Sequence, residues 1–280
     1  LEGSFDDAQS IVKALFADGD FARRVSLTAV NSINFARIAA QSVYYFTASA
    51  ALDQLGHAAD AAPTFIVPTG NFGDIFAGEA AMRMGLPVRG LVIATNANDI
   101  LVRALKDGVY APGAGHATLS PSMDIQVASN FERALFEACG RDAAWTAGAM
   151  AVFARDRRLE LPDAVLKALR GRYSAYAVND DATLATIAAV KAETGRILDP
   201  HTAVAVSAGR LIGPRTDGGA AVILSTAHPA KFPDAVTRAT GAPPPVPPRL
   251  AGLKALPERM ETLAVDTVSI KHFISSRLLF

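Results

Sequence analysis

A strand, a glycine-containing turn, a helix and a second strand follow one another within residues 64–94, and this pattern constrains the fold most. The apolar run 64–67 follows a proline, and residues 75–85 have the apolar spacing of a helix. A Gly-Leu-Pro break then precedes the β-rich run 88–94. Such a βαβ unit requires parallel strands joined by a right-handed crossover. The sequence therefore predicts an α/β fold with a mostly parallel sheet.

The other elements are predicted from the same kinds of signal. Residues 35–55 contain neither Gly nor Pro and indicate one long helix. Further helices are expected at 131–138, 146–158, 162–169, 182–193 with Asp181 as N-cap, and after Asp199-Pro200-His201-Thr202; strands are expected at 173–178 and, buried, at 221–225.

These elements suggest a division of the chain into three parts. Residues 1–110 and 180–240 are expected to form an α/β domain, and residues 111–179 a mostly helical insertion or lid. Residues 241–280 are expected to be a connector and a C-terminal tail that packs back on the body. The connector contains Pro-Pro-Pro-Val-Pro-Pro, which favours a stiff extended chain.

The balance of charged residues bears on which kinds of molecule the protein binds. The 280 residues are 50% hydrophobic, and 27 Lys and Arg balance 27 Asp and Glu. This balance gives no electrostatic reason to expect nucleic acid or an anionic membrane as partner, so a small molecule is favoured. No segment approaches the roughly 18 apolar residues of a membrane span, and residues 1–30 lack the zones of a signal peptide, which predicts a cytoplasmic protein.

Metal and disulfide chemistry are not expected. The single cysteine, Cys139, excludes an intrachain disulfide and a multi-cysteine zinc site. No cluster of His, Cys, Asp and Glu has the spacing of metal ligands, and no G-x-S-x-G elbow is present.

The strongest local signal is the turn Gly70, Asn71, Phe72, Gly73 and Asp74, which lies between a predicted strand and a predicted helix. Glycines allow successive N–H groups to point into one concavity, and the following helix adds the positive end of its dipole. The turn is therefore suited to a phosphate group. An ordinary βα turn in which Asp74 caps the helix is the alternative.

Two further places carry candidate binding residues. Thr226 directly follows a predicted strand, so its hydroxyl would lie at the carboxyl edge of the sheet, where ligands bind. Asn34 and Arg37 lie at the start of the long helix, after Asn31-Ser32-Ile33, and could form a second anion site. A turn residue and a simple helix cap, respectively, are the alternatives.

Taken in order, six strings resemble threonine synthase, in its longer enterobacterial and fungal branch, over nearly all of residues 1–240. They are NSINFARIAAQ, PTGNFGDIFAGEAAMRMGLP, ATNANDI, TLSPSMDI, DPHTAVA and STAHPAKF. The resemblance implies a fold type II pyridoxal-phosphate enzyme, with a three-layer, open, mostly parallel sheet and a helical insertion.

The resemblance also implies roles for particular residues. The loop from Gly70 to Asp74 would hold the phosphate of pyridoxal 5′-phosphate, and Thr226 would bond the pyridine nitrogen. Asn34, with Arg37, would lie near the phosphate of the substrate. The implied reaction is that of a lyase of threonine biosynthesis, in which O-phospho-L-homoserine and water give L-threonine and phosphate.

One part of the family pattern is missing. Threonine synthases carry their Schiff-base lysine in a motif that ends in Phe-Lys-Asp, and none of the seven lysines lies in such a motif. We therefore expect no catalytic residue in this chain, an N-terminal segment that holds the lysine, and no activity of this piece alone. The whole enzyme is expected to be a monomer or a homodimer.

Two other functions fit the same residues. A serine or threonine dehydratase would share the glycine-rich loop but would not need a second phosphate site. A homologue without the lysine could instead be a non-catalytic module that binds a phosphorylated ligand.

Overall fold

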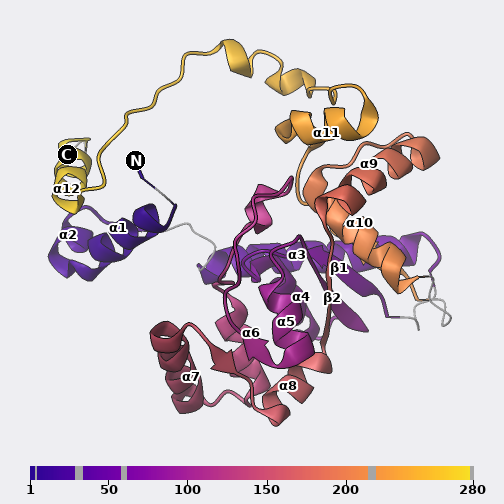
Figure 1. The fold of residues 1–280 in the computed structure, drawn as a ribbon, viewed down its shortest axis with the longest axis horizontal. Helices are drawn as coiled ribbons and strands as arrows, with labels where there is room; N and C mark the ends of the chain where they lie inside the picture. The colour runs from indigo at the N-terminus through magenta and orange to yellow at the C-terminus, as the bar shows by residue number, and fades with distance from the viewer. Residues whose placement is uncertain (4, 29–33, 58–61, 214–218, 278–280) are drawn as a thin grey trace. The chain divides into compact units, whose positions relative to one another are not determined.

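The computed structural model describes residues 1–3, 5–28, 34–57, 62–213 and 219–277. The chain divides into two compact units, residues 32–247 and residues 1–31 together with 248–280 (Figure 1). The larger unit holds the sheet and every candidate binding residue.

The sheet of the larger unit has four parallel strands in the order β5-β2-β1-β6. These strands are β1 (Thr64–Pro68), β2 (Gly90–Thr95), β5 (Tyr173–Ala177) and β6 (Ala221–Ile223). All residues of β1 are buried, and Ile66 pairs with both Val92 and Ile223. Helix α4 (Gly73–Arg83) connects β1 to β2, so the predicted βαβ unit is confirmed.

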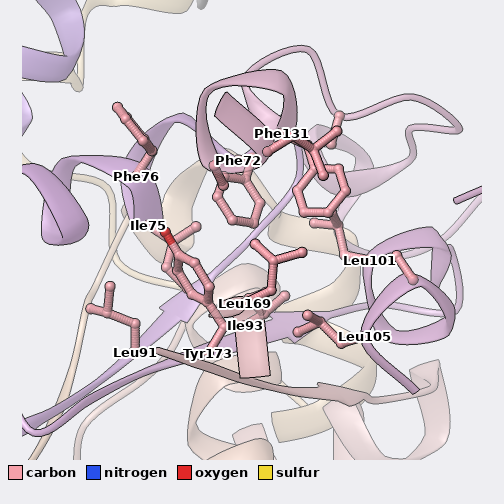
Figure 2. Packing of buried hydrophobic residues seen from close by; sticks show 14 of the residues in the cluster. Phe72, Ile75, Phe76, Leu91, Ile93, Leu101, Leu105, Phe131, Leu169 and Tyr173 are labelled. Carbon is pink, nitrogen blue, oxygen red and sulfur yellow. The ribbon is translucent and has the colours of Figure 1, made fainter. Parts of the chain in front are cut away.

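Helices cover both faces of this sheet, which gives three layers (Figure 1). Phe65, Val67 and Ile93 face the larger apolar cluster, which includes side chains of α3 (Phe35–Gln54), α4, α5 (Ile100–Asp107) and α6 (Phe131–Ala138). Figure 2 shows part of this packing around Phe72 and Tyr173. Ile66 and Val92 face the opposite side and pack with α10 (Pro200–Ile212). The alternation follows from the two-residue period of a strand.

The middle of the chain is not a separate insertion. Strand β5 pairs with β2 in the four-stranded sheet, although residues 111–179 were expected to form a mostly helical insertion. Leu135, Phe153 and Leu169 lie in the same apolar cluster as Phe65. The remaining elements here are β3 (Val109–Tyr110), η1 (Pro121–Met123), α7 (Ala143–Asp156), β4 (Leu159–Glu160) and α8 (Asp163–Arg170). Because these helices bury their apolar faces in the common core, the expected boundary at residue 179 is wrong.

The smaller unit contains segments from both ends of the chain. Its helices are α1 (Phe5–Ala17), α2 (Gly19–Arg24) and α12 (Thr267–Arg277), and it also contains η3 (Pro248–Leu250) and η4 (Leu253–Ala255). Ile11, Leu15, Phe21 and Ile270 form its core. Residues 1–31 were expected within the α/β domain, and the tail was expected to pack back on the body. In the structure these two segments pack on each other, because both contribute side chains to one small apolar cluster.

Two local predictions also need correction. The N-cap of α9 (Asp180–Thr194) is Asn179, whose side chain accepts a hydrogen bond from Ala182 N, and Asp181 lies in the first turn. Strand β6 is shorter than expected and lies at the edge of the sheet, with Ala221 exposed. Helix α11 (Pro233–Thr240) follows η2 (Pro229–Lys231), and residues 243–247 have no regular structure, as their prolines predict.

Within the described ranges, no helix combines the length and the apolar character that a membrane span requires. The same ranges contain no group of His, Cys, Asp and Glu that could hold a metal ion.

A buried carboxylate ties α4 to β5. Glu79 is 1% exposed, and it accepts hydrogen bonds from Arg83 at 2.8 Å, from Arg172 at 3.0 Å and from the Tyr173 hydroxyl. The guanidinium groups of Arg83, in α4, and of Arg172, the residue before β5, therefore both pair with the Glu79 carboxylate. Burial, together with the negative charge of Glu79, raises the pKa of Tyr173 well above its usual value.

We predict that Glu79→Gln lowers the free energy of unfolding by about 2–3 kcal/mol in urea titrations. Removing one partner of a fully buried ion pair costs about 3–5 kcal/mol. The Arg83 and Arg172 side chains are 32% and 30% exposed, so water compensates part of that loss. As a control, Glu160→Gln breaks only an exposed pair with Arg158 and should change stability by less than about 0.5 kcal/mol. Equal effects of the two variants would contradict the prediction.

Candidate functional site

Two of the predicted binding regions meet at one pocket. Because β1 and β6 are adjacent and parallel, the loops that follow them lie at the same edge of the sheet. Asp74 from the first region and Thr226 from the second both line a pocket of about 590 Å³. A pocket of this size suits a small molecule. The other lining residues come from one face of α3 and from β6 and its end: Gln41, Tyr44, Thr47, Ala48, Val222, Ile223, Leu224 and Ser225.

The turn after β1 is fixed by backbone and amide contacts. The Asn71 side chain accepts a hydrogen bond from Gly73 N at 2.9 Å, and Asn71 O accepts one from Asn130 N at 3.0 Å. Phe72 has a left-handed backbone with φ of 68°, and its buried ring contacts Phe131 and Tyr173. Core packing of the ring therefore stabilises a conformation that a non-glycine residue rarely adopts. The first N–H groups of α4 begin directly after this turn and have no partner within the helix.

Both glycines of the turn lie in tight surroundings. A Cβ on Gly70 would lie 2.7 Å from the carbonyl oxygen of Ser122, and one on Gly73 would lie 3.0 Å from Asn71 Oδ1. A side chain at either position would push the turn out of place. Gly70 thus allows close approach of the Ser122 backbone, and Gly73 allows close approach of the Asn71 side chain.

Asp74 is held by two tyrosines of α3 and does not cap its own helix. The Tyr44 hydroxyl donates to Asp74 Oδ1, and the Tyr45 hydroxyl is within hydrogen-bond distance of both Asp74 O, at 2.9 Å, and Asp74 Oδ1, at 3.3 Å. Burial raises the pKa of Asp74 from 3.8 to about 6, and the two tyrosine hydrogen bonds oppose that shift. The tyrosine pKa values are raised by burial and by the neighbouring carboxylate. These tyrosines were not among the predicted site residues, although the spacing of positions 41, 44 and 48 indicates a common helix face.

The predicted second anion site lies outside this pocket. Asn34 is the N-cap of α3 and its side chain accepts a hydrogen bond from Ala36 N at 2.9 Å. Arg37 is exposed on the first turn of the same helix, and neither residue lines the pocket. Asn31, Ser32 and Ile33 lie outside the described residues. A role of Asn34 and Arg37 in binding substrate stays a prediction.

No lysine is among the residues that line the pocket. Lys231, the nearest lysine to Thr226 along the chain, lies in η2, and its Nζ stands 5.9 Å from the centre of the Phe232 ring. That this chain holds no catalytic lysine stays a prediction.

We predict that Asp74→Asn weakens the pH dependence of stability between about pH 4 and pH 7. The folded pKa is above the unfolded value, so this carboxyl group stabilises the fold at low pH, and its contribution is lost as the pH rises through about 6. The wild type should therefore lose stability relative to the Asn variant, by at most about 3 kcal/mol at about 1.4 kcal/mol per pKa unit.

Thermal unfolding of both proteins across this pH range measures the difference. Asp53→Asn, at an exposed position of α3, is the matched control and should follow the wild-type profile. A difference between wild type and Asp74→Asn that does not vary with pH would contradict the raised pKa.

Comparison with known proteins identifies related chains. Residues 202–274 match the family model described as "Threonine synthase, C-terminal". Threonine synthase of Pseudomonas aeruginosa is 46% identical over 98% of this chain and 58% of its own length. That of Saccharomyces cerevisiae is 42% identical over 85% of this chain and 49% of its own length.

Solved structures give the same result and confirm the predicted fold class. The crystal structure of pyridoxal-phosphate-bound threonine synthase from Brucella melitensis has a TM-score of 0.90 and 46% identity, and it covers 98% of this chain. Threonine synthase from yeast has a TM-score of 0.86 and 36% identity. This chain spans 58% of each of those two chains. The family model, the aligned sequences and the shared fold thus agree that this chain is similar to threonine synthases, and it spans 58% of the length of the bacterial relatives named here.

Proposed function

We propose that the protein to which this chain belongs converts O-phospho-L-homoserine and water into L-threonine and phosphate, with pyridoxal 5′-phosphate as cofactor. The chain spans 58% of the length of its bacterial relative, so the activity is proposed for the whole protein. The observation that carries the proposal is the common pocket of Asp74 and Thr226, beside the start of α4.

The residues present fit pyridoxal phosphate. The N–H groups of the first turn of α4 have no partner within the helix, so backbone N–H groups are the donors that the turn offers to a phosphate. The dipole of α4 adds positive potential at the same place. The pocket that Thr226 lines lies at the same edge of the sheet and has the volume of a small-molecule site.

Each group then has a distinct task. The turn from Gly70 to Asp74 binds the cofactor phosphate, and Thr226 offers a hydroxyl to the pyridine nitrogen. When bound, the cofactor supplies an electron sink for the loss of protons next to the amino group. A neutral hydroxyl, unlike a carboxylate, does not hold a proton on the ring nitrogen, which favours elimination and replacement over transamination. Asn34 and Arg37 bind the phosphate of the substrate.

Three further expectations from the sequence also stay predictions. The lysine that holds the cofactor is expected in a Phe-Lys-Asp motif upstream of residue 1. The whole protein is expected to be a monomer or a homodimer and to be cytoplasmic.

We predict that Gly70→Ala weakens binding of 4′-deoxypyridoxine 5′-phosphate to this chain at least about tenfold, the equivalent of about 1.4 kcal/mol. This analogue has the ring and phosphate of the cofactor but no aldehyde, so it cannot react with surface lysines. The added Cβ would collide with the Ser122 carbonyl oxygen and displace the turn. Titration followed by ³¹P NMR measures the affinity.

Gly148→Ala is the matched control, because a Cβ at Gly148 meets nothing within 4 Å and the position lies inside α7. It should bind the analogue as the wild type does. Equal affinity of Gly70→Ala and Gly148→Ala would refute the assignment of the phosphate to this turn.

The reaction itself is tested with the full-length protein. Supplied with pyridoxal phosphate and O-phospho-L-homoserine, it should release L-threonine and phosphate in equal amounts. Release of ammonia and a 2-oxo acid from serine or threonine, without turnover of the phosphorylated substrate, would instead establish a dehydratase.

A further inference from the structure

Three buried polar residues at the start of α10 are not used by the proposed chemistry. Asp199, His201 and Thr202, here called the Asp199 cluster, are 1%, 4% and 3% exposed. Asp199 is the N-cap of α10, and its Oδ1 accepts hydrogen bonds from His201 N at 2.9 Å and Thr202 N at 3.3 Å. A helix cap requires no more than these backbone contacts. The side chains of His201 and Thr202 make further contacts away from the helix.

The Thr202 side chain reaches the loop that carries Thr226. Its hydroxyl donates to Asp199 Oδ2, and its oxygen accepts a hydrogen bond from Thr226 N at 3.3 Å. A hydroxyl has one proton and two lone pairs. Because the proton is directed to the carboxylate, the lone pairs are left for the Thr226 N–H group. Asp199 thus orients the hydroxyl that holds the backbone of Thr226.

The His201 side chain reaches in another direction, to residue 122. Its Nε2 accepts a hydrogen bond from Ser122 N at 3.2 Å, so this nitrogen carries a lone pair. In the neutral ring the proton is then on Nδ1, which lies 3.1 Å from Asp199 Oδ1 and donates to it. Phe232 packs on the imidazole, with ring centres 4.7 Å apart.

Residue 122 in turn lies against the glycine-rich turn. The Ser122 carbonyl oxygen would be 2.7 Å from a Cβ on Gly70, and the next residue, Met123, is buried among side chains of α10 and the sheet. Ser122 therefore connects His201 to the first residue of the phosphate-binding turn. The contacts run without a gap from that turn through the Asp199 cluster to Thr226.

We infer that Asp199, His201 and Thr202 are positioning residues, which hold the phosphate-binding turn and the Thr226 loop at a fixed separation. The inference rests on the proposed function, because that function gives these two loops opposite ends of one cofactor. One carboxylate orients both connections: its Oδ2 sets the Thr202 hydroxyl and its Oδ1 sets the His201 ring. None of the three residues is assigned a contact with cofactor or substrate.

A first experiment uses the unchanged chain without any ligand. ¹⁵N NMR of the histidine rings should show His201 as a neutral ring with its proton on Nδ1. A ring protonated on Nε2, or on both nitrogens at neutral pH, cannot accept from Ser122 N and would overturn the inference. This test does not depend on whether the chain binds a cofactor.

A second experiment compares Thr202→Val with Thr202→Ser. Valine has the shape of threonine but lacks the hydroxyl, whereas serine retains it. In Thr202→Val, amide hydrogen exchange at Thr226 should rise about fivefold, the equivalent of the roughly 1 kcal/mol that a hydrogen bond contributes. Exchange in β1 and β2 should stay unchanged, which separates a local effect from lost stability. Thr202→Ser should stay within about twofold of the wild type at every position.

The same variants are then titrated with 4′-deoxypyridoxine 5′-phosphate. The affinity of Thr202→Val should fall about tenfold and that of Thr202→Ser should be retained. If the wild type binds and Thr202→Val binds equally well, the inference is wrong and the proposed function stands. If the wild type does not bind, the proposed cofactor site fails in this chain, and exchange at Thr226 alone decides whether the cluster holds the loop. Unchanged exchange at Thr226 in Thr202→Val overturns the inference in either case.

Discussion

The in-register parallel pairing of β1 with β2 and β6 is the constraint on which the rest of the larger unit depends. It brings the turn after β1 and the loop after β6 to one edge of the sheet. A shift of one residue in β1 would exchange Phe65 and Val67 with Ile66 between two different helical layers. The buried side chains of β1 therefore fix the register, and the register fixes which loops are neighbours.

Helices on the two faces of the sheet contact the loops at that edge. Helix α3 places Tyr44 and Tyr45 on Asp74, and α10 places the Asp199 cluster against Ser122 and Thr226. In both cases a buried polar group is satisfied by a partner far away in the sequence, because an unpaired group there would cost about 1–3 kcal/mol. The same contacts that satisfy these groups also determine where the loops lie.

Most of the fold could be predicted from local patterns. The βαβ unit, the long helix α3 and the helix at 131–138 agree with the structure because turn residues and apolar spacing act over a few residues. The assignment of β5 to an insertion and of residues 1–31 to the α/β domain was wrong. The sequence of a strand does not indicate which strand it pairs with. The sequence of a short amphipathic helix does not indicate which apolar surface it packs against.

The sequence by itself determined the kind of chemistry: a glycine turn before a helix, a threonine after a strand, and no lysine in the family motif. Only the tertiary structure decided which groups meet. Asp74 and Thr226 line one pocket, and Asn34 does not line it. Asp199 is the N-cap of α10, and its carboxylate also contacts the Thr202 and His201 side chains, which bond to the two loops. The reason is physical: residue type and spacing set what a group can donate or accept, whereas strand register and helix packing set the distance to its partner.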